Sequence, residues 1–138
     1  MKLIATAVFA LFLGVVSVGT LGTPVSAKAN TTPPAEVVYK YEAQSGDSYS
    51  LIARKAVQTY GKKFKVELAL GQVLFAETHL TQVAHSPMLG VGQKVAIKEA
   101  TIKTWVESAK KLTTAQKAAW QSYAQFANFD TNAVGQKV

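Results

Sequence analysis

The chain has 138 residues, with 15 basic and 8 acidic side chains, a net charge of +7 and no cysteine. This length suits one small domain and is too short for two. The absence of cysteine excludes a disulfide scaffold and any thiolate metal site. The positive charge favours acidic polymers as partners, among them anionic wall polysaccharides, phospholipid head groups and DNA.

The N-terminal segment is typical of an export signal. Lys2 precedes an apolar stretch over residues 3–21, the helix breaker Pro24 follows, and small residues lead up to Ala27. A signal peptidase recognises this order, so we expect residues 1–27 to be a signal peptide. The apolar stretch is also close to the ~20 residues that span a bilayer, so an uncleaved membrane anchor is the alternative. Both interpretations place the rest of the chain outside the cytoplasm, in a secreted bacterial protein.

A spacer and a strand follow the signal. Residues 28–38 contain two adjacent prolines among short polar side chains, which is typical of a semi-extended spacer. A segment rich in valine and tyrosine predicts a short strand over residues 38–43. The sequence Ser-Gly-Asp-Ser at 45–48 then predicts a turn and a helix start, because Asp47 or Ser48 can accept hydrogen bonds from the first free amides of a helix.

Two helices are predicted next. Apolar residues at helical spacing predict the first over residues 49–60, and Gly61 is a suitable end because glycine tolerates the left-handed conformation. Leucine, valine and alanine at three- and four-residue steps predict the second from about residue 67. Gly71 inside it costs roughly 1 kcal/mol against alanine, so we expect it to mark the close approach of a neighbouring backbone.

The remaining chain predicts a second strand and two more helices. An alternating segment at residues 94–98 follows two glycines and predicts the strand. The helices are expected over residues 101–111 and from Thr113 or Thr114 to Ala127, with an apolar side on the second made of Ala115, Ala118, Ala119, Trp120, Tyr123 and Phe126. Residues 129–138 lack periodicity and are expected to be a flexible tail. This order predicts an α+β fold with a small antiparallel sheet and helices on one face.

Two blocks of this sequence resemble the lysin motif, or LysM, family. The first is YEAQSGDSYSLIA at residues 41–53, and the second is LGVGQKVAI at residues 89–97. The resemblance covers residues 39–98 and implies a βααβ fold with a two-stranded antiparallel sheet. Residues 99–128 would then be a C-terminal helical extension. The chain departs from the family in its extra length between the blocks and in lacking the usual asparagine after the second helix.

LysM-like domains bind polymers that contain N-acetylglucosamine, namely peptidoglycan or chitin, without cleaving them. The resemblance implies a groove with two walls, formed here by residues 46–49 and residues 78–81. The implied ligand-binding residues are Gly46, Asp47, Ser48, Tyr49, Thr78, His79, Leu80 and Thr81. By this interpretation Gly46 lets the backbone approach the ligand and Asp47 shapes the turn. Tyr49 has two roles open to it, stacking on a sugar ring or burial in the core.

Catalysis and metal binding have little support in the sequence. Glu77 and His79 point about 200° apart on a helix, and His85 is also poorly spaced to join them. Asp47 and Glu77 are the only carboxylates that could face a common groove, as glycoside hydrolysis requires, but Asp47 has a structural role as a turn residue. We therefore expect no enzyme activity, no metal and no cofactor. Both histidines are expected to be solvent-exposed, with a groove role for His79 as the alternative.

The sequence thus predicts an exported, wall-associated protein that binds peptidoglycan or a chitin-like glycan. Anionic wall polymers are further candidate partners because of the positive charge. Nucleic acid is not expected, since no basic stripe with interleaved aromatic residues occurs. The alternative is a structural protein that docks another envelope protein, using the apolar side chains between Trp105 and Phe126.

Overall fold

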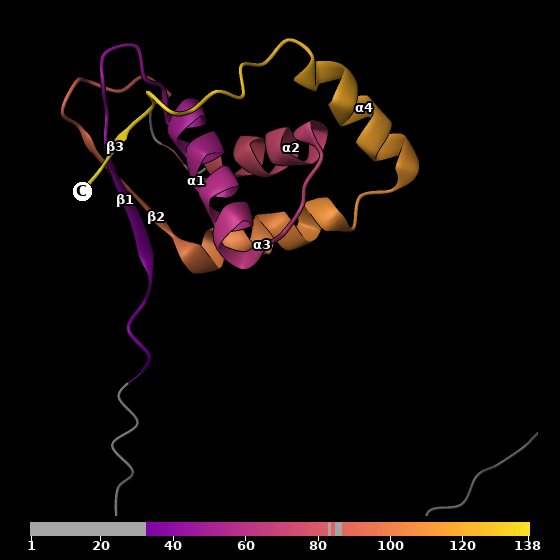
Figure 1. The fold of residues 1–138 in the computed structure, drawn as a ribbon, viewed down its shortest axis with the longest axis horizontal. Coiled ribbons are helices and arrows are strands. Elements are labelled where there is room, and N and C mark those ends of the chain that lie inside the picture. Colours follow the sequence, from indigo (N-terminus) through magenta and orange to yellow (C-terminus); the bar gives the residue numbers. More distant parts are fainter. Residues whose placement is uncertain (1–32, 83, 85–86) are drawn as a thin grey trace, which may run out of the picture. The chain divides into compact units, whose positions relative to one another are not determined.

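The computed structural model describes residues 33–82, 84 and 87–138, so the predicted signal peptide lies outside the described residues. The fold is α+β, with four helices and a three-stranded antiparallel sheet (Figure 1). In chain order the elements are β1 (Val38–Glu42), α1 (Tyr49–Phe64), α2 (Leu70–Thr81), β2 (Lys94–Lys98), α3 (Glu99–Lys110), α4 (Thr114–Ala124) and β3 (Gln136–Lys137). The predicted β-α-α-β order is confirmed.

The sheet has one strand more than predicted. Its order is β2-β1-β3, and β1 pairs with both neighbours in antiparallel register, Tyr41 lying opposite Val95 of β2 and Lys137 of β3. Alternation in β1 and β2 buries four side chains against the helices and leaves the other face to solvent. The buried side chains are Tyr39, Tyr41, Val95 and Ile97. The prediction of two strands was wrong because a two-residue strand is too short to show alternation.

Helix α1 begins where predicted but ends later. Ser48 caps it by accepting a hydrogen bond from the backbone N–H of Leu51 at 3.3 Å. The helix continues through Gly61 to Phe64, and Lys65 takes the left-handed conformation with a φ of 54°. Gly61 is needed instead for space, because a Cβ there would lie 3.0 Å from the carbonyl oxygen of Val66. The predicted end at Gly61 was therefore wrong by about one turn.

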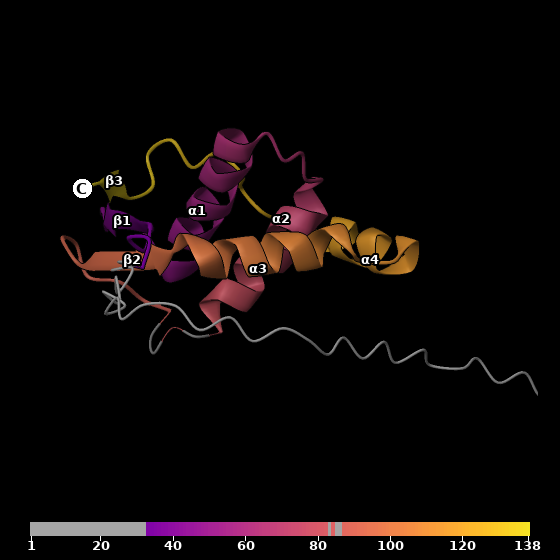
Figure 2. The ribbon, with the colours of Figure 1, turned by 90° about the horizontal axis from the view of Figure 1, so that it is seen from below.

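Helix α2 is the central helix of the domain, in contact with α1, α3 and α4 (Figure 2). This position explains why its sequence is apolar on more than one side. The expected close approach at Gly71 is confirmed. A Cβ at this position would lie 2.6 Å from the backbone nitrogen of Gln121 and 2.8 Å from the carbonyl carbon of Trp120, both in α4.

The two C-terminal helices are buried to different extents. Helix α3 buries Ile102, Val106 and Ala109. Helix α4, capped by Thr113, ends at Ala124 and not at Ala127, and Ala124 is its only fully buried residue. Most of its predicted apolar side is exposed, with Tyr123 at 64% and Phe126, just beyond the helix, at 84%. Among the described residues, helix α2 covers one edge of α4.

The segment after α4 is attached along α1, although its sequence predicted a flexible tail (Figure 1). Arg54 of α1 donates to the carbonyl oxygen of Asn128, and Gln58 donates to that of Phe129 at 3.0 Å. Lys55 donates to the carbonyl oxygens of Val134 and Gly135. Because the acceptors are backbone atoms, no side-chain periodicity reveals these contacts.

Candidate functional site

The two sequence blocks form two similar turns that are hydrogen-bonded to each other. Residues 44–47 and 90–93 each place a glycine at the third position, Gly46 with a φ of 87° and Gly92 with a φ of 81°. In each turn the backbone N–H of the fourth residue donates to the carbonyl oxygen of the first residue. The distance is 3.1 Å in residues 44–47 and 3.0 Å in residues 90–93. This is type II geometry, which requires a positive φ at the third position and so explains both glycines. Ala43 joins the turns, because its backbone N–H donates to the carbonyl oxygen of Gln93 and its carbonyl oxygen accepts from the N–H of Gly92.

Asp47 has the structural role that the turn predicted. Its Oδ2 accepts from the backbone N–H of Gln44 at 2.8 Å, within the turn. The same oxygen accepts from the N–H of Gly135 at 2.8 Å and so attaches the C-terminal segment to the turn. Because both backbone amides donate to this one oxygen, the Asp47 carboxylate stabilises the turn and its contact with the C-terminal segment.

The start of α1 lies beside the segment that precedes β2. The N–H of Tyr49 donates to the carbonyl oxygen of Pro87 at 3.1 Å, and Ser48 forms an antiparallel bridge with Met88. We call Gly46–Tyr49 together with Pro87–Met88 the paired-loop surface. The Met88 side chain is 81% exposed on it. The sequence-based prediction placed the second wall of the groove at residues 78–81 and so missed this pairing.

Tyr49 is half-buried and packs against the hydrophobic core. Burial raises the pKa of its hydroxyl above the ordinary value. Of the two roles that the sequence left open, the structure therefore supports packing for most of the ring. The paired-loop surface owes its exposed apolar area chiefly to Met88.

The second predicted wall is only partly at the surface. Thr78 and Thr81 are half-buried near the end of α2. The Thr78 hydroxyl donates to the carbonyl oxygen of Leu74 at 2.8 Å, and the Thr81 hydroxyl donates to that of Thr78 at 2.7 Å. Leu80 is 1% exposed and belongs to the core, so its assignment to a ligand-binding wall was wrong. A helix turns its side chains through 100° per residue, and consecutive residues cannot all face one groove.

His79 is a packed residue and not a solvent-exposed one. Its ring lies 4.2 Å from the Phe75 ring and 4.4 Å from the Trp105 ring, between centroids. Its Nδ1 lies 2.8 Å from the carbonyl oxygen of Phe75, one turn earlier in α2. These contacts connect α2 to α3. His85, the other histidine considered, lies outside the described residues.

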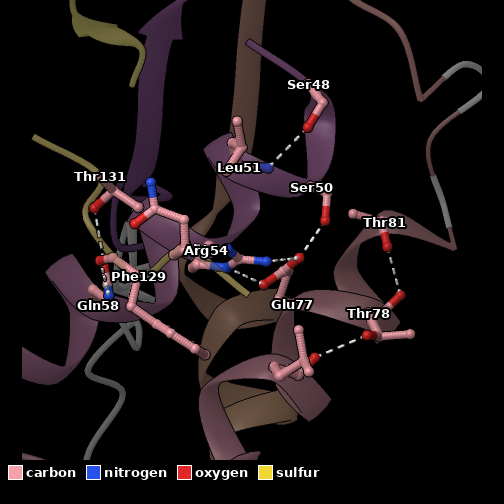
Figure 3. Close-up of polar contacts among 12 residues, drawn as sticks. Ser48, Ser50, Leu51, Arg54, Gln58, Glu77, Thr78, Thr81, Phe129 and Thr131 are labelled. Atoms are coloured by element: carbon pink, nitrogen blue, oxygen red, sulfur yellow. Dashed lines mark hydrogen bonds and ion pairs between the residues drawn. The ribbon is translucent and has the colours of Figure 1, made fainter. Parts of the chain in front are cut away.

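Glu77 forms a buried ion pair with Arg54 (Figure 3). Arg54 Nε lies 2.5 Å from Oε2, and Nη2 lies 2.9 Å from Oε1, which is a bidentate arrangement. The Ser50 hydroxyl donates to the same carboxylate, whose residue is 2% exposed. Glu77 is thus held inside the domain, joining α1 to α2, and does not face a common cleft with Asp47.

Other features of the described residues bear on function. No three histidine, aspartate or glutamate side chains among them are grouped to hold a metal ion. Within the same part of the chain, no helix is both long and apolar enough to cross a membrane. No family model, curated protein or solved structure gives a significant match to this chain. The LysM resemblance therefore depends on the quoted residues and on the arrangement of the two turns.

Proposed function

We propose that this chain is an exported, non-catalytic module that binds N-acetylglucosamine-containing wall polysaccharide, peptidoglycan in particular, at the paired-loop surface. One observation carries the proposal. The antiparallel pairing of β1 and β2 brings the loop before α1 next to the loop before β2, and the Ser48–Met88 bridge joins them. The two sequence blocks that resemble the LysM family thus meet at one end of the sheet.

The chemistry of this surface suits an acetamido sugar. Such a sugar presents an amide N–H, a carbonyl and a methyl group to its receptor. Exposed turn backbone at Gly46 can exchange hydrogen bonds with the amide, while the exposed Met88 side chain provides an apolar contact for the methyl. The net positive charge of the chain would add attraction to anionic wall polymers.

A pull-down of the chain without residues 1–27 on insoluble peptidoglycan tests the proposal. The variant Met88→Asp removes the apolar contact, and Phe126→Asp is its matched control, since both side chains are more than 80% exposed. We expect the wild type and Phe126→Asp to bind at high salt and Met88→Asp to be depleted from the pellet. If high salt abolishes the binding, or if Met88→Asp binds as well as the wild type, the binding is only nonspecific charge attraction and the proposal is contradicted.

The alternative function, docking to another envelope protein, is favoured by the exposed apolar side of α4. Tyr123 and Phe126 are 64% and 84% exposed, and exposed alanines continue the same side of the helix. Patches of this kind mark protein interaction sites. Under this alternative, purified wall would not retain the chain, and Phe126→Asp would reduce its co-purification with envelope proteins while Met88→Asp would not.

A further inference from the structure

One peptide group of the C-terminal segment is held at both ends by charged side chains from around the start of α1. The carbonyl oxygen of Val134 accepts a hydrogen bond from the Lys55 ammonium group, which also donates to the carbonyl oxygen of Gly135 at 2.8 Å. The N–H of Gly135 belongs to the same peptide group as the Val134 carbonyl, and it donates to Asp47 Oδ2 at 2.8 Å. A cation and an anion of the domain thus bind opposite ends of a single amide.

The chain is anchored on both sides of this peptide group. Before it, the Thr131 hydroxyl donates to Gln58 Oε1 at 2.6 Å, and Val134 is 7% exposed within the hydrophobic core. After it, β3 pairs with β1. Gly135 itself lies so close to β1 that a Cβ on it would be 3.3 Å from the Cβ of Tyr41. The Gly135 N–H is therefore a fixed donor for the Asp47 carboxylate.

Asp47 carries this restraint into the turn before α1. The oxygen that accepts from Gly135 also accepts from the N–H of Gln44, at the other end of the turn. The turn contains Gly46, and glycine adopts a wider range of backbone conformations than other residues. A turn built on Gly46 keeps a single shape only when its neighbours restrain it. A surface held in its binding shape loses less conformational entropy when the ligand arrives.

We propose that Lys55 and Gly135 are positioning residues for glycan binding, and that they act through Asp47 on the turn at residues 44–47. The inference rests on the proposed function, since it explains how the paired-loop surface keeps its shape. Neither positioning residue belongs to that surface, so each affects the ligand through the turn. The segment after α4 is then a working part of the binding site, although it lies outside the two blocks that resemble the LysM family.

The test compares Lys55→Met with Gln58→Met in the chain without residues 1–27. Each substitution removes two hydrogen bonds between α1 and the C-terminal segment, but those of Gln58 go to Phe129 and Thr131, away from the peptide group that holds Asp47. Lysine, glutamine and methionine have similar helix propensities, so α1 itself should be equally stable in both variants. The ligand is an uncharged oligomer of N-acetylglucosamine, so loss of the lysine charge does not by itself change the attraction.

Lys55→Met should weaken oligomer binding about fivefold, which is the population change that loss of one hydrogen bond of ordinary strength can produce. Gln58→Met should bind like the wild type. The amide NMR signals of Gln44 and Gly46 give a second readout, one that a general loss of stability would not move. They should shift in Lys55→Met before any ligand is added and keep their wild-type positions in Gln58→Met.

Gly135→Pro is a second variant, because proline has no N–H for Asp47 to accept, and it should weaken binding as Lys55→Met does. Equal binding by the wild type and these two variants overturns the inference and leaves the proposed function intact. Equal weakening in Lys55→Met and Gln58→Met also overturns it, because the C-terminal segment would then act only through general stability. A wild type that does not bind the oligomer overturns the proposed glycan binding, and the inference with it.

Discussion

Replacing Gly71 with alanine should destabilise the domain, although alanine is the better helix former. Gly71 lies in the first turn of α2, where its backbone faces α4. Its N–H donates to the Oε1 of Gln121 at 3.1 Å, which supplies a partner for an amide that the helix itself cannot satisfy. The substitution therefore tests whether α4 packs on α2 by direct backbone contact.

Two opposing contributions decide the magnitude. Alanine in place of glycine inside a helix is favourable by roughly 0.5–1 kcal/mol. Against this, the new Cβ would lie 2.6 Å, 2.8 Å and 2.9 Å from backbone atoms of Trp120 and Gln121. Backbone atoms cannot rotate away as a side chain can, so overpacking should cost about 1–3 kcal/mol. Loss of the Gln121 hydrogen bond adds about 1 kcal/mol, so a net loss of about 1–3.5 kcal/mol is expected.

Urea unfolding followed by tryptophan fluorescence measures this loss, and Trp120 also reports on the α2–α4 contact. Gly90→Ala is the control, because a Cβ at Gly90 meets no atom within 4 Å, and its stability should stay within about 0.5 kcal/mol of wild type. A Gly71→Ala variant as stable as wild type, or more stable, would refute the backbone contact between α2 and α4.

Substitutions at three further positions test the polar interactions. Glu77→Ala leaves the buried guanidinium of Arg54 without its carboxylate and should cost about 3–5 kcal/mol in thermal or urea unfolding. Asp47→Ala removes the acceptor of two backbone N–H groups and should cost about 2 kcal/mol, while Asp47→Asn, which keeps an acceptor oxygen, should cost less. The Lys63 hydrogen bond lowers the pKa of Glu99, so the stability that this carboxylate contributes is present above its ordinary pKa and is lost as the pH falls through the lowered value. The difference in melting temperature between wild type and Glu99→Gln should therefore narrow below about pH 4.

Each of these results has an outcome that would contradict its reasoning. Glu107→Ala removes an exposed ion pair and should lower stability by at most about 1 kcal/mol. If Glu77→Ala and Glu107→Ala lower stability equally, burial does not make the Arg54–Glu77 pair more important than an exposed one. Asp47→Asn as damaging as Asp47→Ala would mean that the turn requires the charge itself. If the difference in melting temperature between wild type and Glu99→Gln stays constant from pH 7 to pH 3, the ionised form of Glu99 does not contribute to stability.

The apolar pattern of the sequence was enough to predict the order of the first six elements. Alternation predicted β2 at its observed bounds, and helical spacing predicted α1 to α4 with errors only at their ends. Gly71 was interpreted correctly because a glycine inside a strong helical pattern needs a steric reason. These features depend on local periodicity, which a single sequence displays directly.

Other features depend on pairs of residues that are distant in the sequence, and these were not predicted. Glu77 was considered as a residue facing a groove because nothing in the sequence shows that Arg54 lies beside it. The C-terminal segment was expected to be loose because its hydrogen bonds use its own backbone atoms. Leu80 was assigned to a wall because the LysM resemblance implied that residues 78–81 line the groove, although the helical period places Leu80 in the core.

The central place of β1 in the sheet has a consequence for how the domain forms. Its two partners, β2 and β3, lie far along the chain from it, and β3 is the most distant element of all. Contacts between distant segments form slowly because a long loop must close first. A chain that crosses a membrane with its N-terminus first would therefore emerge with β1 unpaired, and the sheet would be completed only after Gln136 had crossed. Such an order of events would keep the sheet incomplete during transport and would let it form on the far side of the membrane.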